Sequence, residues 1–538
     1  MASRKEILKK VLGELPLTAE VYWLLRQSSD PLPYNFSLKT IREILPEAVA
    51  ITKKSRKTHP AGKKVFLFAS THYWLEHVVM TGLALSGIGH DVTVGYYPYG
   101  KWNIDTNQFD LRRQNVYANN VLKEAAEVIH FENMLRNNFS FSQLPARLTA
   151  DLEQVTDYDY MYHFQTEDVD RDDSFYQFRY NRNLHASKAL YNYLRKSPPD
   201  VAIIPNGTIL EFGIAYRVCR NLKIPTSTYE FSDKRGAMWL AQNEEIMQQN
   251  TDALWNAHAE YKPSSAELEE TRVLLSSRRN ATTYGDYTRK WQRIPAEGQA
   301  AIKKKLGLTE KPVVLLATNV LGDSLTLGRN TFTKSMSEWI IRTIQYFIEK
   351  PEIQLVIRIH PGEALVKHGS ILDMIRKTLP QLPPHIKLIE PLDEVNTYDL
   401  MDVADLGLVY TTTVGLEMAL RGIPVVVAGK THYRNRGFTH DPGTWVEYFK
   451  LLNRLLENLR ENRLNEEQVN LAWKYTYLFF FRYQLPFPWT MVQLKEDLEV
   501  NSLKDLLCAS GMKKYRATFD ALTFTLTKDG NHGKHNAG

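Results

Sequence analysis

The sequence has few of the features that stabilise a secreted protein or anchor one in a membrane. Only two of its 538 residues are cysteines, Cys219 in "YRVCRNL" and Cys508 in "KDLLCAS", and they offer neither a disulfide framework nor metal-ligand spacing. No run of roughly 18 or more apolar residues occurs, and the charged start "MASRKEILKK" has no apolar segment of the kind that a secretory leader needs. These absences predict a folded, cytoplasmic protein with two buried or inert thiols.

The net charge is too small to indicate a nucleic-acid partner, because 67 lysines and arginines against 61 acids give only +6 at pH 7. Basic residues cluster near the start instead. "SRKEILKKVLGELPLTAEVYWLLRQ" mixes them with leucines and with the pair Tyr22 and Trp23, and "ITKKSRKTHPAGKK" follows. Two interpretations stay open: a solvated helix packed on the protein, or peripheral contact with the anionic inner face of the cell membrane.

Apolar runs and helical patterns alternate along most of the chain. The run "KKVFLFAST", the helical "HYWLEHVVMTGLALSGIGH" and the run "DVTVGYYP" make a strand-helix-strand unit, and the same order returns from "PDVAIIPNG" to "PTSTYEF". A second series has strands at "VVLLAT", "QLVIRIH", "IKLIE", "LGLVY" and "PVVVAG". Strands that alternate with helices predict parallel sheets, so we expect an α/β protein with two Rossmann-like domains.

The expected organisation has five parts. They are a helical extension at 1–60, a first α/β domain at 61–300, a second at 301–465, a helical segment at 466–524 and a disordered polar tail at 525–538. The fourth part begins with the aromatic "WKYTYLFFFRYQLPFPW", for which we expect a helix in a groove between the domains, with a membrane surface as the alternative.

Parallel sheets bind ligands at the carboxyl ends of their strands, so polar residues that directly follow strands are candidates for a site. In "LLATNVLGDS", Asn319 and Asp323 come after the first strand of the second series. Such residues also form ordinary turns, so a plain polar loop is the alternative.

The second candidate is "LVIRIHPGE". Arg358 and His360 fall on one face of a strand, Pro361 turns the chain, and Glu363 lies in the first turn of the next helix. An arginine, a histidine and a helix start converge there, where an anion would be stabilised. A structural histidine is the alternative.

The third candidate is "YTTTVGLEMALRG". Thr411, Thr412 and Thr413 follow a strand, and a capping box would need an acid or glutamine three residues after Thr413, where the sequence has leucine. The acid is Glu417, one residue too late. A helix start rich in hydroxyl groups can bind a phosphate, and Glu417 can accept hydrogen bonds from ribose hydroxyls. The alternative is that the threonines only cap the helix.

Downstream, Tyr433 belongs to "GKTHYRNRGFTHDPG", for which we expect a long active-site loop.

These motifs, in this order, resemble the bacterial capsule polysaccharide biosynthesis family. Its members are glycosyltransferases of the GT-B fold and include transferases of Kdo (3-deoxy-manno-octulosonic acid) from CMP-Kdo. The resemblance rests on "RIHPGE", "TTTVGLEMALRGIPVVVAG" and "HYRNRGFTHDP", within residues 313–445. It implies that His360 and Pro361, with two of the three threonines, bind the phosphate and cytidine of the donor. It also implies a donor site on the second domain, an acceptor site on the first, and neither metal nor cofactor. Accordingly, no Asp-x-Asp pair lies in a plausible metal-binding loop.

The expected function is therefore transfer of a sugar from a nucleotide-activated donor, CMP-Kdo-like or another, to a growing capsule, exopolysaccharide or lipopolysaccharide glycan on a lipid-linked or glycan acceptor. A CDP-glycerol-type polymer transferase, a sugar-nucleotide epimerase and a non-catalytic nucleotide-sugar-binding protein are the alternatives. An inverting transfer needs a general base, for which we favour Glu230 at the end of "TYEF", with His72 second.

Overall fold

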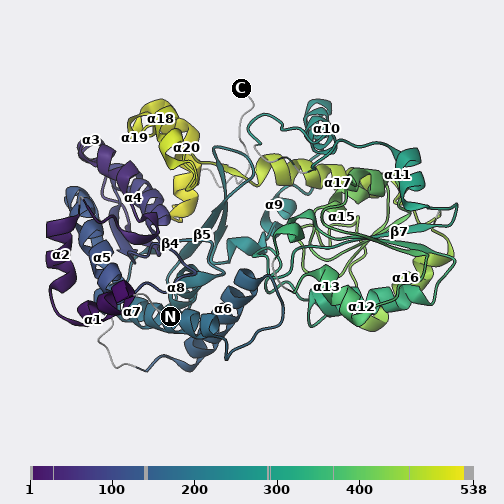
Figure 1. The fold of residues 1–538 in the computed structure, drawn as a ribbon. Coiled ribbons are helices and arrows are strands. Elements are labelled where there is room, and N and C mark those ends of the chain that lie inside the picture. The colour runs from purple at the N-terminus through teal and green to yellow at the C-terminus, as the bar shows by residue number, and fades with distance from the viewer. Residues whose placement is uncertain are drawn as a thin grey trace.

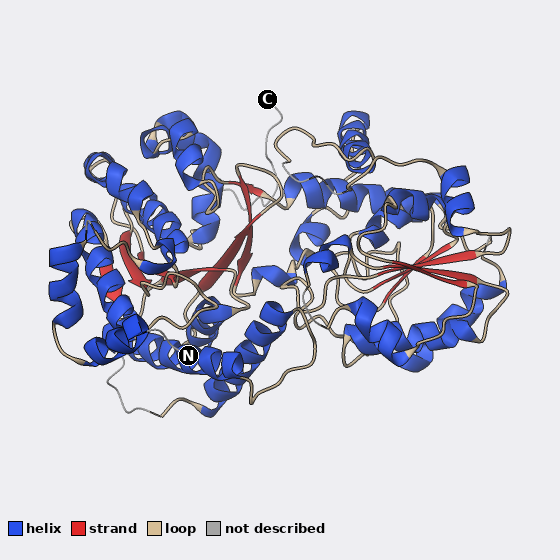
Figure 2. Cartoon of the chain, in the orientation of Figure 1, coloured by secondary structure: helices blue, strands red, loops and turns tan. Residues whose placement is uncertain are grey.

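The computed structural model describes residues 4–27, 29–137, 143–287, 290, 292–366, 369–459 and 461–525. The chain forms two α/β domains side by side, each built on a sheet of its own (Figures 1 and 2). The predicted fold class, with two mostly parallel, Rossmann-like sheets and helical flanks, is confirmed. The predicted disordered tail falls, apart from Thr525, outside the described residues.

The first sheet has seven strands in the order β12-β6-β5-β4-β1-β2-β3. The strands β1 to β5 pair in parallel, whereas β6 and β12 join antiparallel at one edge. The interior strand β1 is buried at every position after Lys64, as an apolar run covered on both faces must be. The bounds of the strands are β1 (Lys64–Ala69), β2 (Asp91–Tyr96), β3 (His130–Asn133), β4 (Val201–Pro205), β5 (Thr226–Phe231), β6 (Ala237–Gln242) and β12 (Leu485–Pro486).

The second sheet has five strands, all parallel, in the order β11-β10-β7-β8-β9. Each forms at one of the five apolar runs from which a strand is predicted. Their bounds are β7 (Val313–Ala317), β8 (Gln354–Arg358), β9 (Ile386–Ile389), β10 (Leu406–Val409) and β11 (Val425–Val427). Because all five run the same way, the loops after β7, β8 and β10 meet at one edge.

Helices surround both sheets, together with a few short helical turns. In the first domain and its extension they are α1 (Arg4–Glu14), α2 (Thr18–Arg26), η1 (Pro33–Asn35), α3 (Lys39–Arg56), α4 (His72–Gly87), α5 (Gln108–Leu122), η2 (Lys123–Ala125), η3 (Met134–Asn137), α6 (Ala146–Phe164), α7 (Ser174–Lys196), α8 (Leu210–Asn221) and η4 (Ile246–Gln248). The following ones are α9 (Asp252–Ala257), α10 (Ser265–Arg279), α11 (Gln299–Leu306), α12 (Met336–Ile348), η5 (Pro361–Leu365), α13 (Ile371–Thr378), α14 (Thr397–Val403), α15 (Val414–Ala419), α16 (Trp445–Glu457), α17 (Glu466–Tyr477), η6 (Leu478–Arg482), α18 (Leu494–Val500), α19 (Leu503–Leu507) and α20 (Ala509–Leu522). None of the helices in these ranges is long and apolar enough to cross a membrane.

The chain enters the second domain earlier than the division expected near residue 300. Leu274 of α10 and Tyr287 are buried in the same hydrophobic cluster as β7 and β10. The described residues between β6 and residue 300 form no strand of either sheet, so no alternation of strand and helix marks where the domain begins.

The aromatic segment of the predicted fourth part connects the two cores. Tyr475 and Phe480 are buried in the second domain, whereas Phe487 and Trp489 are buried in the first. Between them the chain makes a π-helical turn, η6, and then adds β12 to the edge of β6. The helices α18 to α20 therefore return to the first domain, where α19 packs on α3 and α4.

The two cysteines differ in their surroundings. Cys219 is buried, and burial raises the pKa of its thiol to about 12, which makes it inert as predicted. Cys508 is exposed, because its side chain caps α20 at the surface, where it accepts a hydrogen bond from the amide of Gly511. The pKa of its thiol is lowered by a hydrogen bond from Ser510, so the expectation of a buried or inert thiol is wrong for Cys508.

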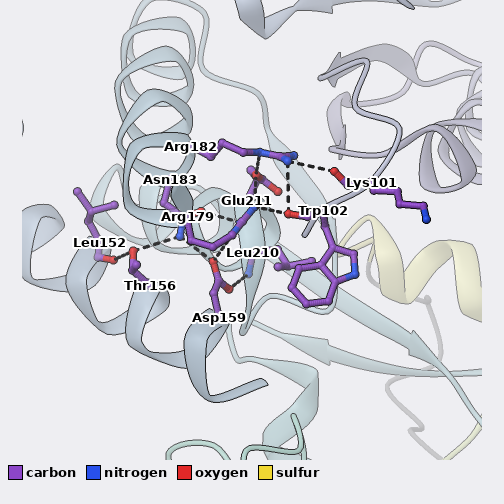
Figure 3. A network of polar contacts seen from close by, with 10 residues as sticks. All are labelled: Lys101, Trp102, Leu152, Thr156, Asp159, Arg179, Arg182, Asn183, Leu210 and Glu211. Atoms are coloured by element: carbon purple, nitrogen blue, oxygen red, sulfur yellow. Dashed lines mark hydrogen bonds and ion pairs between the residues drawn. The ribbon is translucent and has the colours of Figure 1, made fainter. Parts of the chain in front are cut away.

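A buried charge network joins α6, α7 and α8 of the first domain (Figure 3). Arg179 forms ion pairs of 3.0 Å with both Asp159 and Glu211, and all three side chains are fully buried. Arg182 pairs with Glu211 at 2.9 Å. Although burial alone would raise the pKa of Glu211, the charges of Arg179 and Arg182 outweigh it and hold the pKa at about 2. Glu211 is therefore charged and compensated by the two arginines, whereas burial raises the pKa of Asp159 even beside Arg179.

The network also fixes the loop that follows β2. The guanidinium of Arg179 donates to the carbonyl oxygen of Trp102 (3.0 Å), and that of Arg182 donates to the carbonyls of Lys101 (3.1 Å) and Trp102. Figure 3 shows both arginines converging on this loop. The indole of Trp102 then packs against Tyr162 of α6, with ring centroids 5.6 Å apart.

The two domains touch where α6 ends. The carboxylate of Glu167 accepts hydrogen bonds from the backbone amides of Met336 and Ser337, both at 2.8 Å, and from the Ser337 hydroxyl at 2.6 Å. Nearby, Gly322 has φ 67° and lies so close to α6 that a Cβ would sit 2.1 Å from the carbonyl oxygen of Met161. Glu167 thus satisfies orphan amides at the start of α12 in the other domain.

We expect Glu167→Ala to loosen this contact. The amides of Met336 and Ser337 should exchange with solvent about tenfold faster or more, since a hydrogen bond to a charged group contributes about 1.5–3 kcal/mol. Hydrogen exchange of the peptide that contains the start of α12 measures this. Asp168→Ala, at the exposed next position, is the matched control and should change nothing. Equal exchange in both variants would contradict the assignment.

Glu211→Ala should destabilise the first domain by about 3–5 kcal/mol, because it leaves two buried arginines short of a counter-charge. Denaturant unfolding measures the difference. Glu153→Ala is the control: it removes an exposed carboxylate 3.4 Å from Arg171, worth about 1 kcal/mol at most. A similar loss in both variants would show that burial of the network has no energetic consequence.

Candidate functional site

A pocket of about 290 Å³ lies at the carboxyl edge of the second sheet. Its walls come from the ends of β7 and β8, the turn η5, and the starts of α14 and α15. Six of the residues predicted to bind a donor line it: Arg358, His360, Pro361, Thr412, Thr413 and Glu417. These six residues are spread over sixty positions of the sequence, yet they lie around one cavity. A pocket of about 300 Å³ beside β3 contains none of the predicted residues.

His360 is held by the turn that it starts. Its Nδ1 accepts a hydrogen bond from the amide of Gly362 (3.0 Å), and its own amide donates to the hydroxyl of Thr318 (3.0 Å). An Nδ1 that accepts carries no proton, so the neutral ring is protonated at Nε2. His360 therefore presents the wall of the pocket with a hydrogen-bond donor.

Arg358 brings a buried positive charge to the same wall. Its guanidinium donates to the carbonyl oxygens of Glu390 (2.7 Å) and Val395 (3.3 Å), which fix its orientation. Burial lowers its pKa to about 10, which leaves it fully protonated at neutral pH. The buried Nε has no hydrogen-bond partner among the described residues. A buried cation with an unused donor is the kind of group that an anionic ligand satisfies.

The sequence predicts no capping box at Thr413, and none forms there. Thr413 is the N-cap of α15, yet its side chain makes no capping hydrogen bond. The amide of Val414 approaches the Thr412 hydroxyl only at 3.4 Å. Gly415 is required for packing, because a Cβ there would lie 2.4 Å from the hydroxyl of Tyr433. The hydroxyls of Thr412 and Thr413 thus remain at the pocket instead of closing the helix end.

Glu417 lines the pocket but is also part of the core. Its Oε1 accepts from Nη1 of Arg278 at 3.1 Å, and both side chains are buried. The hydroxyl of Tyr398 lies against the same carboxylate. Glu417 is therefore a fixed acceptor with a compensated charge, and its predicted contact with ribose stays a prediction.

The other predicted residues support the pocket from behind. The Asn319 side chain accepts from the amide of Thr411 (3.1 Å), and Thr411 itself is buried. Tyr433 is fully buried and donates to the carbonyl oxygen of Thr412 (2.6 Å). Glu363 accepts from the amide of Ile371 (2.9 Å), and burial raises its pKa to about 7. These four side chains do not line the cavity, so any donor contact by them stays a prediction.

Several residues of the pocket carry no signal in the sequence. Lys290, Gln292 and Arg293 come from the segment before the second sheet, and Thr397 and Tyr398 from the start of α14. The side chain of Gln292 accepts from the amide of Thr397 (3.0 Å), which ties the segment to the pocket. Lys290 and Arg293 are exposed cations at the cavity. The basic run "RKWQR" is the one sequence feature that could have indicated these two cations.

The first domain supplies the candidates for a general base. Glu230 ends β5, and its carboxylate accepts from the amides of Phe231 (3.0 Å) and of the Asn206 side chain (3.3 Å). Burial raises its pKa. His72 starts α4, where burial lowers its pKa, so its ring is neutral at pH 7. Both groups are thus poised to accept a proton, as a base must be.

Tyr162 of α6 links the two domains electrostatically. Burial raises the pKa of its hydroxyl, and the negative charges of Asp323 and Glu230 raise it further. Asp323 belongs to the second domain, in the loop where its carboxylate accepts from the amide of Leu325 (2.8 Å). Asp323 of the second domain and Glu230 of the first thus both lie close enough to Tyr162 to raise the pKa of its hydroxyl.

Comparison with known proteins supports the resemblance for part of the chain. Residues 244–473 match the family model described as "Capsule polysaccharide biosynthesis protein". This is somewhat less than half of the sequence, and it includes every residue that lines the pocket. No curated protein matches the sequence.

Solved structures resemble this chain at low identity. The beta Kdo 2,4 transferase KpsC of Thermosulfurimonas dismutans is 16% identical, over 51% of this chain and 78% of that one, with a TM-score of 0.32. The UDP-GlcNAc 2-epimerase of Neisseria meningitidis, bound to UDP-GlcNAc, is 14% identical, over 77% of this chain and 100% of that one, with a TM-score of 0.25. Over residues 244–473, the resemblance to capsule polysaccharide biosynthesis proteins is confirmed by the family model.

Proposed function

We propose that this protein is a glycosyltransferase of the GT-B type that takes its sugar from a nucleotide-activated donor. The observation that carries the proposal is the pocket at the carboxyl edge of the second sheet, where Arg358, His360 and two threonine hydroxyls surround one cavity. The match to the capsule polysaccharide biosynthesis model over the same residues supports it. A CMP-Kdo-like donor and a capsule, exopolysaccharide or lipopolysaccharide acceptor are the finer form of the proposal.

In this proposal the donor phosphate lies between Arg358, His360 and the threonines. Arg358 offers a buried cation with an unused Nε, and His360 donates from Nε2. Lys290 and Arg293 add positive charge at the exposed side of the cavity. Such preorganised donors stabilise the negative charge that develops on the leaving phosphate, without a metal. Glu417 accepts hydrogen bonds from the ribose hydroxyls.

The acceptor binds on the side of the first domain. Its hydroxyl attacks the anomeric carbon of the donor sugar, a new carbon–oxygen bond forms, and the bond from that carbon to the nucleotide phosphate breaks. Glu230 takes the proton of the attacking hydroxyl, and the bonding electrons leave with the phosphate. The raised pKa of Glu230 strengthens it as a base, provided that the pH keeps it ionised. His72 is the alternative base.

The donor site is tested by nucleotide binding. We expect one of CMP, CDP, UDP and GDP to raise the midpoint of thermal unfolding, because a ligand that binds only the folded state stabilises it. His360→Ala should weaken the Kd of that nucleotide about tenfold or more, which corresponds to roughly 1.4 kcal/mol. Titration of the midpoint against nucleotide concentration measures both effects.

The matched control is His385→Ala. His385 belongs to the same domain, but its ring contacts the carbonyl oxygen of Phe347 (2.9 Å), away from the pocket. It should leave nucleotide binding unchanged. The donor-site assignment fails if none of the four nucleotides stabilises the protein, or if His360→Ala binds as tightly as the His385 variant does.

Glu230→Gln tests the base. The variant should keep the nucleotide-induced shift and lose at least about a hundredfold in transfer rate, since general base catalysis contributes about 10²–10⁴. In the wild type, the rate should fall as the pH drops through the pKa of Glu230. That pKa is raised above 4.5 by burial, so the loss begins at a higher pH than an ordinary glutamate would give. Product assays over a pH series measure this.

Glu132→Gln, at the edge strand β3 of the same sheet, is the control and should transfer at the wild-type rate. Full activity of Glu230→Gln would move the role of base to His72. Product formed from the donor alone, without any acceptor, would identify an epimerase instead.

A further inference from the structure

The first two helices expose an unusual amount of aliphatic surface. The side chains of seven residues in this segment are between 48% and 75% exposed: Leu8, Val11, Leu15, Leu17, Val21, Leu24 and Leu25. Only six other large hydrophobic residues are comparably exposed in the described part of the chain, and those are spread from Val273 to Val500. We call the seven the aliphatic face.

The spacing shows that this face is a feature of the helices. Leu8 and Val11 lie three positions apart on α1, and Leu15 follows directly after its end; Val21, Leu24 and Leu25 lie on α2, whose N-cap is Leu17. A helix on the surface of a globular protein ordinarily turns such a stripe towards the core. Here the aliphatic side chains of both helices face the solvent instead.

The opposite sides of the helices attach them to the first domain. Lys9 of α1 pairs with Asp110 of α5 at 2.7 Å, and Glu20 of α2 accepts from Nε of Arg112 at 2.9 Å. Trp23 is buried, with its ring 5.9 Å from that of Tyr117. Polar contacts and one tryptophan therefore fix α1 and α2 on α5, and this leaves the aliphatic face exposed among the residues that the structure describes.

The amino-terminal part of the chain, which includes these two helices, is basic. Residues 1–64 contain 13 lysines and arginines against 6 acids, a net charge of +7, whereas residues 65–538 contain 54 against 55, a net charge of −1. Exposed cations include Lys10 and Arg26 on these two helices, and Lys54 and Lys57 at the end of α3. The first 64 residues thus carry all of the positive net charge, and the helical segment 4–26 itself, with five cations against three acids, carries +2 of it.

We propose that α1 and α2 dock this protein on an anionic lipid bilayer, with the aliphatic face in the interfacial region and the basic residues at the headgroups. Exposed leucine and valine gain free energy in the acyl boundary, and each cation near an anionic surface adds to it. A second copy of the chain fits this face poorly, because it would bring together two helical segments that each carry a net charge of +2.

The position of the helices suits such docking. Figure 1 shows α1 and α2 at the end of the molecule that lies away from the strands of the second sheet. A bilayer at that end leaves the pocket of the second domain open to soluble ligands. This inference goes beyond the proposed function, since it concerns only where the protein is held.

Co-sedimentation with vesicles tests the proposal. The full chain should bind vesicles of phosphatidylcholine mixed with phosphatidylglycerol, bind pure phosphatidylcholine far less, and dissociate as salt is added. The double variant Leu24→Ser and Leu25→Ser should lower the partition coefficient about tenfold or more. Because both side chains are exposed, its thermal unfolding midpoint should equal that of the wild type.

The matched control is Val446→Ser with Val492→Ser, which removes two side chains that are 78% and 80% exposed elsewhere on the surface. It should bind vesicles as the wild type does. The proposal is wrong if the wild type does not bind the anionic vesicles, or if both double variants bind equally. It is also wrong if light scattering shows a dimer that only the leucine variant dissociates, since a second copy then covers the face.

Discussion

Strands buried on both faces of a parallel sheet must satisfy every backbone polar group within the sheet, and this constraint shapes both domains. It forces helices over each face, so ligands can reach the strands only at their ends. In the second domain the carboxyl ends of β7, β8 and β10 supply Thr318, Arg358, Thr412 and Thr413 to one cavity. The polar residues that follow the strands are therefore the ones free to carry chemistry.

This is also why much of the second domain could be predicted from the sequence. Each of its five strands is a short apolar run bounded by polar residues, and the side-chain period of two places Arg358 and His360 on the same face. The absence of an acid three residues after Thr413 correctly indicated that its hydroxyl would not close the helix. Local chemistry alone decided these features.

What escaped prediction depends on partners that are distant in the sequence. The sequence did not reveal that Arg278, 139 residues away, is the buried counter-ion of Glu417. Nor did it reveal that Asn319 and Tyr433 each bond the backbone of the threonine loop, while the predicted donor contacts of all three residues stay predictions. The strands β6 and β12 were missed because they extend an edge and need not be apolar on both faces. A local sequence pattern does not show which distant residue a polar side chain will contact in the folded protein.

The return of the chain to the first domain has a consequence for how the protein is made. Phe487 and Trp489 belong to the core of the first domain, and β12 covers the edge of β6, but both are translated after the whole second domain. The amino-terminal core therefore stays incomplete on the ribosome while some 230 residues of the second domain are added. An unpaired edge strand is exposed throughout that interval, and the second domain can reach its native state first.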